Sequence, residues 1–102
     1  MSEAPTDELV KIEHFKPHVG KTCSFKGSGH ALVLDRILSN RRRLPKGVTR
    51  RPFTLIFRGP KAPVLTEGLY DCEVEGGPTY SIYVNPVFTP TPDLQEYQAV
   101  FN

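Results

Sequence analysis

The chain has 102 residues, with 13 Lys and Arg against 11 Asp and Glu, and a formal net charge of +2 at pH 7. This length predicts one domain with a single core that needs no metal ion or disulfide to hold it. The sequence has no run of about 18 apolar residues, which excludes a membrane-spanning helix. Its polar, acidic start lacks the basic head and apolar stretch of a secretion signal, so we expect a cytoplasmic protein.

Charge is unevenly distributed along the chain. Between Asp35 and Glu67 the sequence carries nine basic residues and no acidic one. From Glu67 to the C-terminus it carries six acidic residues and no Lys or Arg. A molecule with one positive and one negative segment has a large dipole, which suits binding to a polyanion, to an acidic partner or to a second copy.

The N-terminal residues predict a short helix after a disordered stretch, 1–5. Thr6 is a capping hydroxyl followed by two acidic residues, and apolar residues then recur at helical spacing as far as Phe15. Pro17 limits the helix on its C-terminal side. We therefore expect a helix over about 6–18 whose apolar stripe lies on the core.

After this helix the apolar period becomes two, which predicts strands joined by turns and loops. The segments expected to be strands are 22–25, 31–38, 53–58, 68–75, 80–88 and 97–101. Gly27 and Gly29 suit a hairpin turn after the first strand. Strands with no helices between them predict an antiparallel meander, closed into a small six- to seven-stranded barrel. Residues 6–102 are therefore expected to form one β-barrel-like domain of the mainly β class.

Strict alternation within these strands predicts which side chains face the core. In the second strand it places Leu32, Leu34 and Leu38 on one face and Ile37 on the other. In the later strands the inward sets are Phe53, Leu55 and Phe57, then Tyr70, Cys72 and Val74, then Tyr97, Ala99 and Phe101. Cys23 and Cys72 fall on such apolar faces, so we expect two buried, reduced thiols.

The long polar connection 41–51 is the first candidate site. Its six basic residues are Arg41, Arg42, Arg43, Lys46, Arg50 and Arg51. Long loops in compact domains are often functional, and Lys and Arg suit contact with phosphates or carboxylates. The aromatic residues fall at core-facing positions rather than beside this loop. A protein partner is therefore favoured, and nucleic-acid binding through the same loop is the alternative.

An acidic strand face is the second candidate site. Asp71, Glu73 and Glu75 alternate along one predicted strand, so their carboxylates share its outer face at intervals of about 7 Å. This spacing would also fit an inverting glycosidase pair, a test that any alternating acidic strand passes. We interpret these residues as a candidate counter-surface for the basic loop, or as a solvent face that discourages edge pairing.

Other catalytic and metal-binding patterns are weak. His14 and His18 have the spacing of two zinc ligands on a helix, but Pro17 lies between them and no H-E-x-x-H motif is present. Ser28 does not lie in the strand-to-helix elbow of a hydrolase. We therefore expect no enzyme activity, no metal site and no cofactor. Arg58 is expected to pair with an acidic residue of the 68–75 strand.

Four segments of the sequence resemble a bacterial family of small proteins that is filed as a domain of unknown function. They are an R-x-P-F-[ST]-L-x-F-R-G-P centre at 50–60, a G-x-Y segment at 68–70, a Y-x-A-V-F-N end at 97–102 and an F-x-P-x-x-G-x-x-x-x-F opening at 15–25. The resemblance covers nearly the whole chain. It implies a compact, mostly β domain with no assigned reaction, associated with accessory components of phage-tail-like assemblies.

These observations together predict a non-catalytic interaction or assembly module. Its basic loop would dock on an acidic protein surface, such as the acidic strand of a second copy. Head-to-tail contact between unlike surfaces gives rings or filaments rather than two-fold dimers.

Overall fold

The computed structural model describes residues 11–39 and 52–101. Its elements, in chain order, are α1 (Ile12–Phe15), the 3₁₀ helix η1 (Lys16–His18), β1 (Thr22–Phe25), β2 (His30–Ser39), β3 (Phe53–Pro60), β4 (Gly68–Val74), β5 (Thr79–Val87) and β6 (Leu94–Phe101). Over these residues no helix is long and apolar enough to cross a membrane.

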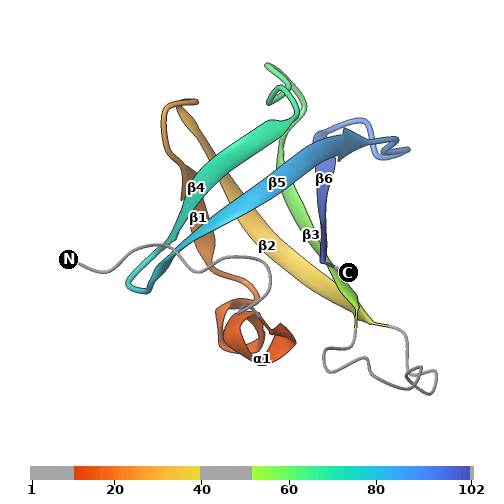
Figure 1. The fold of residues 1–102 in the computed structure, drawn as a ribbon. Coiled ribbons are helices and arrows are strands. Elements are labelled where there is room, and N and C mark those ends of the chain that lie inside the picture. Colours follow the sequence, from red (N-terminus) through yellow and green to blue (C-terminus); the bar gives the residue numbers. More distant parts are fainter. Residues whose placement is uncertain (1–10, 40–51, 102) are drawn as a thin grey trace.

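The six strands are antiparallel and close into a barrel in the order β1-β2-β3-β6-β5-β4 (Figure 1). This confirms the predicted mainly β barrel with a short N-terminal helix. The simple meander was wrong, because β3 pairs with β6 and β4 pairs with β1. The chain forms two three-stranded meanders, β1–β3 and β4–β6. Residues 61–67 separate them, because this segment is an irregular link rather than a tight hairpin turn.

The barrel interior is built from one face of every strand. The predicted inward sets of β3 and β6 are buried, as are Cys72 and Val74 of β4, while Tyr70 packs against the core half-buried. Gly59 lies where Leu32 leaves no space for a side chain. A Cβ atom added there would lie 2.4 Å from Cδ2 of Leu32. Any larger residue at this position would force Leu32 to move.

A bulge in β2 reverses the facing of the second half of that strand. Leu34 is in register with Phe57 and Arg36 with Ile56, which leaves Asp35 as the additional residue. Ile37 consequently packs against the core and Leu38 is 50% exposed. The prediction that Leu38 faces inward and Ile37 outward was therefore wrong, because strict alternation does not allow for an inserted residue.

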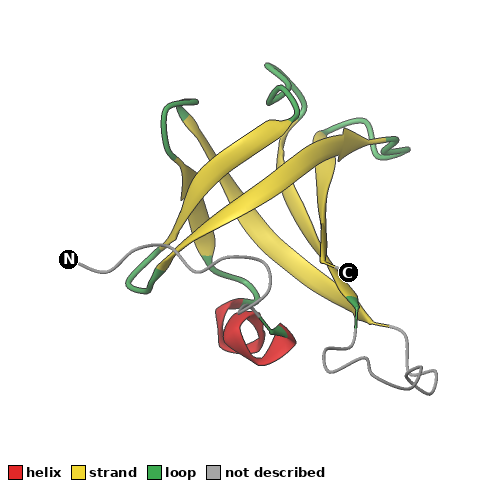
Figure 2. Ribbon diagram, viewed as in Figure 1, coloured by secondary structure: helices red, strands yellow, loops and turns green. Residues whose placement is uncertain are grey.

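Two side chains from outside the strands close the two ends of the barrel. Phe15 of α1 is 2% exposed, and its ring centroid lies 4.7 Å from that of Tyr80 and 5.5 Å from that of Phe101. Leu65, in the link between β3 and β4, is also 2% exposed. Figure 2 shows the helix at one end of the barrel and three of the strand connections at the other.

The predicted helix over 6–18 is present in its second part, as α1 followed by η1. The first part, 6–10, lies outside the described residues. Pro17 occupies one of the first two positions of η1, where no backbone N–H is needed for the helical hydrogen bonds.

Candidate functional site

The predicted basic loop lies outside the described residues, together with its six basic side chains, but its points of attachment are clear. Ser39 ends β2 and is in register with Phe53, which begins β3. The β2–β3 pair is separated from the β4–β5 pair by β1 on one side and by β6 on the other. The basic segment is therefore attached to the wall of the barrel that lies across from the acidic strand (Figure 1).

The acidic residues lie where the sequence predicted them. Asp71, Glu73 and Glu75 are all exposed, with Asp71 and Glu73 on the outer face of β4 and Glu75 just after the strand. Within the described ranges the ion pair formed by these three carboxylates is that of Glu73 with Lys26, at 3.7 Å. Both side chains of that pair are about half exposed, so it is weak. Among the described residues, the outer face of β4 therefore carries more negative than positive charge.

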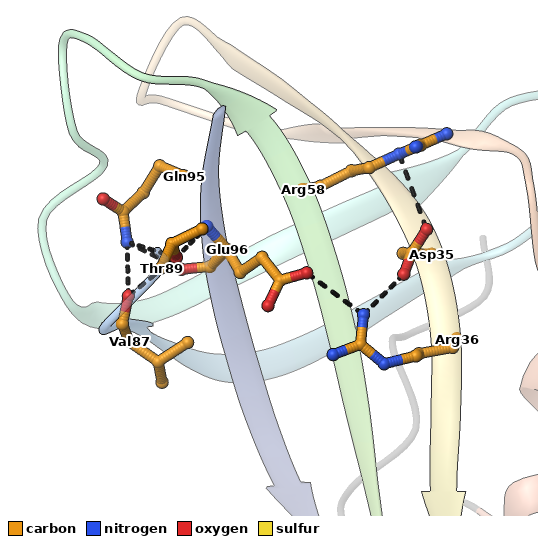
Figure 3. Close-up of polar contacts among 7 residues, drawn as sticks. All are labelled: Asp35, Arg36, Arg58, Val87, Thr89, Gln95 and Glu96. Carbon is orange, nitrogen blue, oxygen red and sulfur yellow. Dashed lines mark hydrogen bonds and ion pairs between the residues drawn. The ribbon is translucent and has the colours of Figure 1, made fainter. Parts of the chain in front are cut away.

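Charges on the opposite wall compensate one another (Figure 3). Arg36 Nη1 contacts Asp35 Oδ2 at 2.6 Å and Glu96 Oε2 at 3.1 Å. Arg58 Nε lies 3.6 Å from Asp35 Oδ1. Two cations thus face two carboxylates, and the hydrogen bonds that Arg36 donates to Glu96 and Asp35 raise the pKa of its guanidinium group. These four side chains therefore leave no net charge on this part of the wall.

This network corrects one prediction and adds a feature that the sequence did not indicate. Arg58 pairs with Asp35 of β2, not with an acidic residue of β4, because β4 is not a neighbour of β3. Arg36 of β2 reaches across β3 to Glu96 of β6. Only the bulge and the strand order bring these residues together, and neither leaves a recognisable pattern in the sequence.

The backbone of Glu96 is held by a cluster of polar side chains (Figure 3). The N–H of Glu96 donates to Oγ1 of Thr89 at 2.9 Å, and that hydroxyl donates to the carbonyl of Val87 at 3.0 Å. Gln95 Nε2 donates to the same carbonyl at 2.6 Å. Thr89 is 8% exposed, so these bonds are shielded from water. They fix the position from which Glu96 meets Arg36.

Exposed apolar residues lie in two places on the outside of the barrel, one on β4 and β5 and the other on β6 and β2. Leu69 is 68% exposed and Tyr83, its register partner, is 50% exposed. Val100 is 48% exposed and is in register with Thr54, which in turn is in register with Leu38. The Tyr83 hydroxyl donates to Oε2 of Glu67, and this bond raises the pKa of the phenol. Tyr83 therefore contacts one of the acidic residues, and Leu69 lies beside it on the strand that carries Asp71 and Glu73.

The two cysteines are free thiols in the core, each 1% exposed. They face one another across the β1–β4 seam, where Cys23 is in register with Val74 and Cys72 with Phe25. The hydrogen bond with Cys23, together with burial, raises the pKa of the Cys72 thiol. The same contact lowers the pKa of the Cys23 thiol, against the effect of burial.

The histidines near the helix make contacts within the domain. His14 Nδ1 accepts a hydrogen bond of 2.8 Å from the N–H of Lys11. Burial, and then the positive charge of Lys21, lower the pKa of His18, whose Nδ1 is buried without a hydrogen-bond partner in the described structure. No three His, Cys, Asp or Glu residues among those described are arranged to hold a metal ion.

Comparison with known proteins gives a family but no function. Residues 10–101 match a family model described as Domain of unknown function (DUF6916). No curated protein and no solved structure matches the chain.

Proposed function

The chain belongs to the DUF6916 family, which confirms the resemblance to a small uncharacterised domain, and we propose that it is a non-catalytic protein-interaction module for assembly. Its acidic β4 face would bind the basic segment 41–51 of a second copy. Repetition of this head-to-tail contact would build a ring or filament, as in a phage-tail-like structure.

One observation supports this proposal above the others, namely the contrast between the two walls of the barrel. Near β4 and β5 lie the four carboxylates of Glu67, Asp71, Glu73 and Glu75, and among the described residues one of them, Glu73, forms an ion pair, with Lys26. On the β2–β3–β6 wall, two carboxylates face two guanidinium groups. Only the first arrangement leaves charge available to a partner.

The positions of the charges are also suited to self-assembly. The acidic hairpin and the attachment points of the basic segment lie on walls separated by a strand on either side. Opposite charges on opposite walls cannot neutralise one another readily within one molecule, but they can meet between two molecules. Exposed Leu69 and Tyr83 beside the acidic face would add apolar contact area.

Light scattering coupled to size-exclusion chromatography, at about 50 and 500 mM NaCl, tests the proposal. We expect oligomers at low salt that dissociate at high salt, because salt screens exposed charges. The variant Glu73→Lys/Glu75→Lys should be monomeric in both buffers. The matched control Glu13→Lys/Asp93→Lys makes the same change in net charge at exposed positions outside β4, and it should retain the oligomers.

A monomer at every salt and protein concentration, or oligomers unaffected by charge reversal on β4, would refute self-assembly through this face. Absorbance at 260 and 280 nm on the same column tests the alternative. A high 260 nm signal that salt removes, and that neutralisation of Arg41, Arg42 and Arg43 abolishes, would favour nucleic-acid binding instead.

A further inference from the structure

The seam between β5 and β6 closes over only part of its length. These strands form three register pairs, from Asn85 with Gln98 to Val87 with Glu96, and no further pair is formed by the described residues toward the start of β5. Figure 1 shows the two strands diverging below this point, with α1 beneath the opening. Phe15 fills the interior behind the opening through its ring contacts with Tyr80 and Phe101.

Backbone hydrogen bonds at the turn between β4 and β5 show which backbone groups face this opening. The N–H of Val74 donates to the carbonyl of Pro78, on the β5 side, at 3.0 Å. The N–H of Glu75 donates to the carbonyl of Thr22, on the β1 side, at 2.9 Å. Even-numbered residues of β4 therefore turn their backbone groups toward β5, because successive residues of a strand alternate between neighbours. Through the register of Cys72 with Tyr80, even-numbered residues of β5 turn toward β4.

It follows that Ser81 and Tyr83 turn their N–H and C=O groups toward the side of β6, where the ladder has already ended. Pro86 agrees with this assignment. It is even-numbered, so its nitrogen faces the β4 side, and β4 begins only at Gly68, opposite Val84. The proline therefore interrupts no hydrogen bond of the ladder. Within residues 11–39 and 52–101 no strand pairs with β5 at Ser81 and Tyr83 on the side of β6, so this edge presents a short row of backbone groups to an added strand.

The side chains around this edge indicate what would bind. Tyr83 is exposed and apolar apart from its hydroxyl, and Leu69 lies beside it on β4. Ser81 and Thr79 are small, and behind them on β4 lie Asp71 and Glu73. A long basic side chain on an added strand could extend over a small residue of β5 to a carboxylate of β4.

The opposite wall already contains such a contact between strands that are not neighbours. Arg36 of β2 crosses β3 and meets Glu96 of β6 at 3.1 Å. An arginine on a strand added to β5 could likewise extend across β5 to the carboxylate of Asp71 on β4. Backbone bonds would supply affinity, and the alternating side chains would supply specificity.

We propose that the β5 edge is a strand-addition site for an extended segment of a partner protein. That segment runs antiparallel to β5 and presents, at alternate outward positions, one apolar residue beside Tyr83 and two basic residues beside Ser81 and Thr79. The proposal rests on the proposed function, because the acidic face of β4 provides the charge that selects the segment.

The test uses the whole chain and the peptide acetyl-Leu-Val-Arg-Val-Arg-Val-amide, titrated by NMR. Two N-methylated forms provide the decisive comparison. In the first form, methyl groups on the backbone nitrogens of the leucine and the first arginine block the N–H groups that would donate to the carbonyls of Tyr83 and Ser81. In the second form, methyl groups on the backbone nitrogens of the first two valines block N–H groups that face away from β5. Loss of two hydrogen bonds should weaken binding about tenfold in the first form only.

Binding should also slow hydrogen exchange of the Ser81 and Tyr83 amides, and the variant Asp71→Lys/Glu73→Lys should weaken binding of the unmodified peptide. Equal affinity for both methylated forms, with loss of binding on charge reversal, would refute strand addition and leave charge-driven docking on β4 intact. No binding by a domain that still forms salt-sensitive oligomers would refute the strand-addition site alone. Edge-specific binding by a strictly monomeric domain would support the site and refute self-assembly.

Discussion

The backbone N–H of Leu65 donates a hydrogen bond of 2.8 Å to the phenol oxygen of Tyr97, and both residues are buried. This bond joins the link between β3 and β4 to β6 at the end of the barrel opposite α1. The link lies between strands that do not pair with one another, so this side-chain acceptor takes the place of a ladder partner for Leu65.

Replacing Tyr97 by Phe should lower the free energy of unfolding by about 1–3 kcal/mol, because it leaves a buried N–H without an acceptor. Urea unfolding followed by circular dichroism measures the loss. Tyr70→Phe is the matched control, since the Tyr70 hydroxyl donates to the carbonyl of Thr66 at an exposed position. That control should change stability by less than about 0.5 kcal/mol. Equal effects of the two substitutions would contradict the role assigned to Tyr97.

Gly59→Ala should destabilise the domain by about 1–3 kcal/mol, because its new methyl group would overlap Leu32. Gly68→Ala serves as the control, since an added Cβ there would meet Tyr70 at an ordinary 3.6 Å. Thermal unfolding of both variants provides the comparison. A Gly59→Ala protein as stable as the Gly68→Ala protein would show that Leu32 can move aside without a loss in the free energy of unfolding.

Removal of the Phe15 ring should be the most damaging of the single changes considered. Phe15→Ala is expected to cost about 3–5 kcal/mol, because the ring fills the end of the barrel between Tyr80 and Phe101. Phe15→Leu retains much of the apolar volume and should cost less. His14→Ala changes an exposed neighbour on the same helix and controls for effects on helix formation. A small effect of Phe15→Ala on the urea midpoint would contradict this role.

His18 should make stability dependent on pH below neutrality. Burial and Lys21 lower the pKa of His18 in the folded state, so the unfolded chain binds the proton more readily. The stability provided by neutral His18 is therefore complete above the unfolded value of about 6.5 and declines as pH falls below it toward the folded pKa. His18→Gln should show a flatter dependence between pH 7.5 and 5 in urea unfolding. Parallel curves for the two proteins would contradict the assignment.

The sequence was sufficient to predict the barrel because the alternation of apolar residues is regular in the strands other than β2. Phe53, Leu55 and Phe57 face inward as the period of two requires, and so do Tyr97, Ala99 and Phe101. The prediction failed at Asp35, where one inserted residue moves Ile37 to the core and Leu38 to the surface. A bulge of this kind depends on pairing with the neighbouring strand and leaves the local composition unchanged.

The candidate site was predictable only in part. Asp71 and Glu73 lie on the outer face that alternation assigned to them, because the face of a strand is a local property. The open edge at Ser81 and Tyr83 was not predictable, because it depends on where β5 and β6 diverge. The strand order likewise determines that Arg58 pairs with Asp35. A local sequence pattern does not encode the strand order.

The β4–β5 hairpin is attached to the remainder of the barrel by two short seams. It forms three register pairs with β1 and three with β6, whereas β3 and β6 share eight. Local unfolding follows the units that have the fewest cross-connections, so this hairpin should open as a unit at a lower free energy than the whole domain. The β2–β3–β6 wall should therefore remain folded when this acidic hairpin opens. A partner that binds the β4–β5 hairpin together with β1 or β6 would also keep the hairpin closed against the barrel.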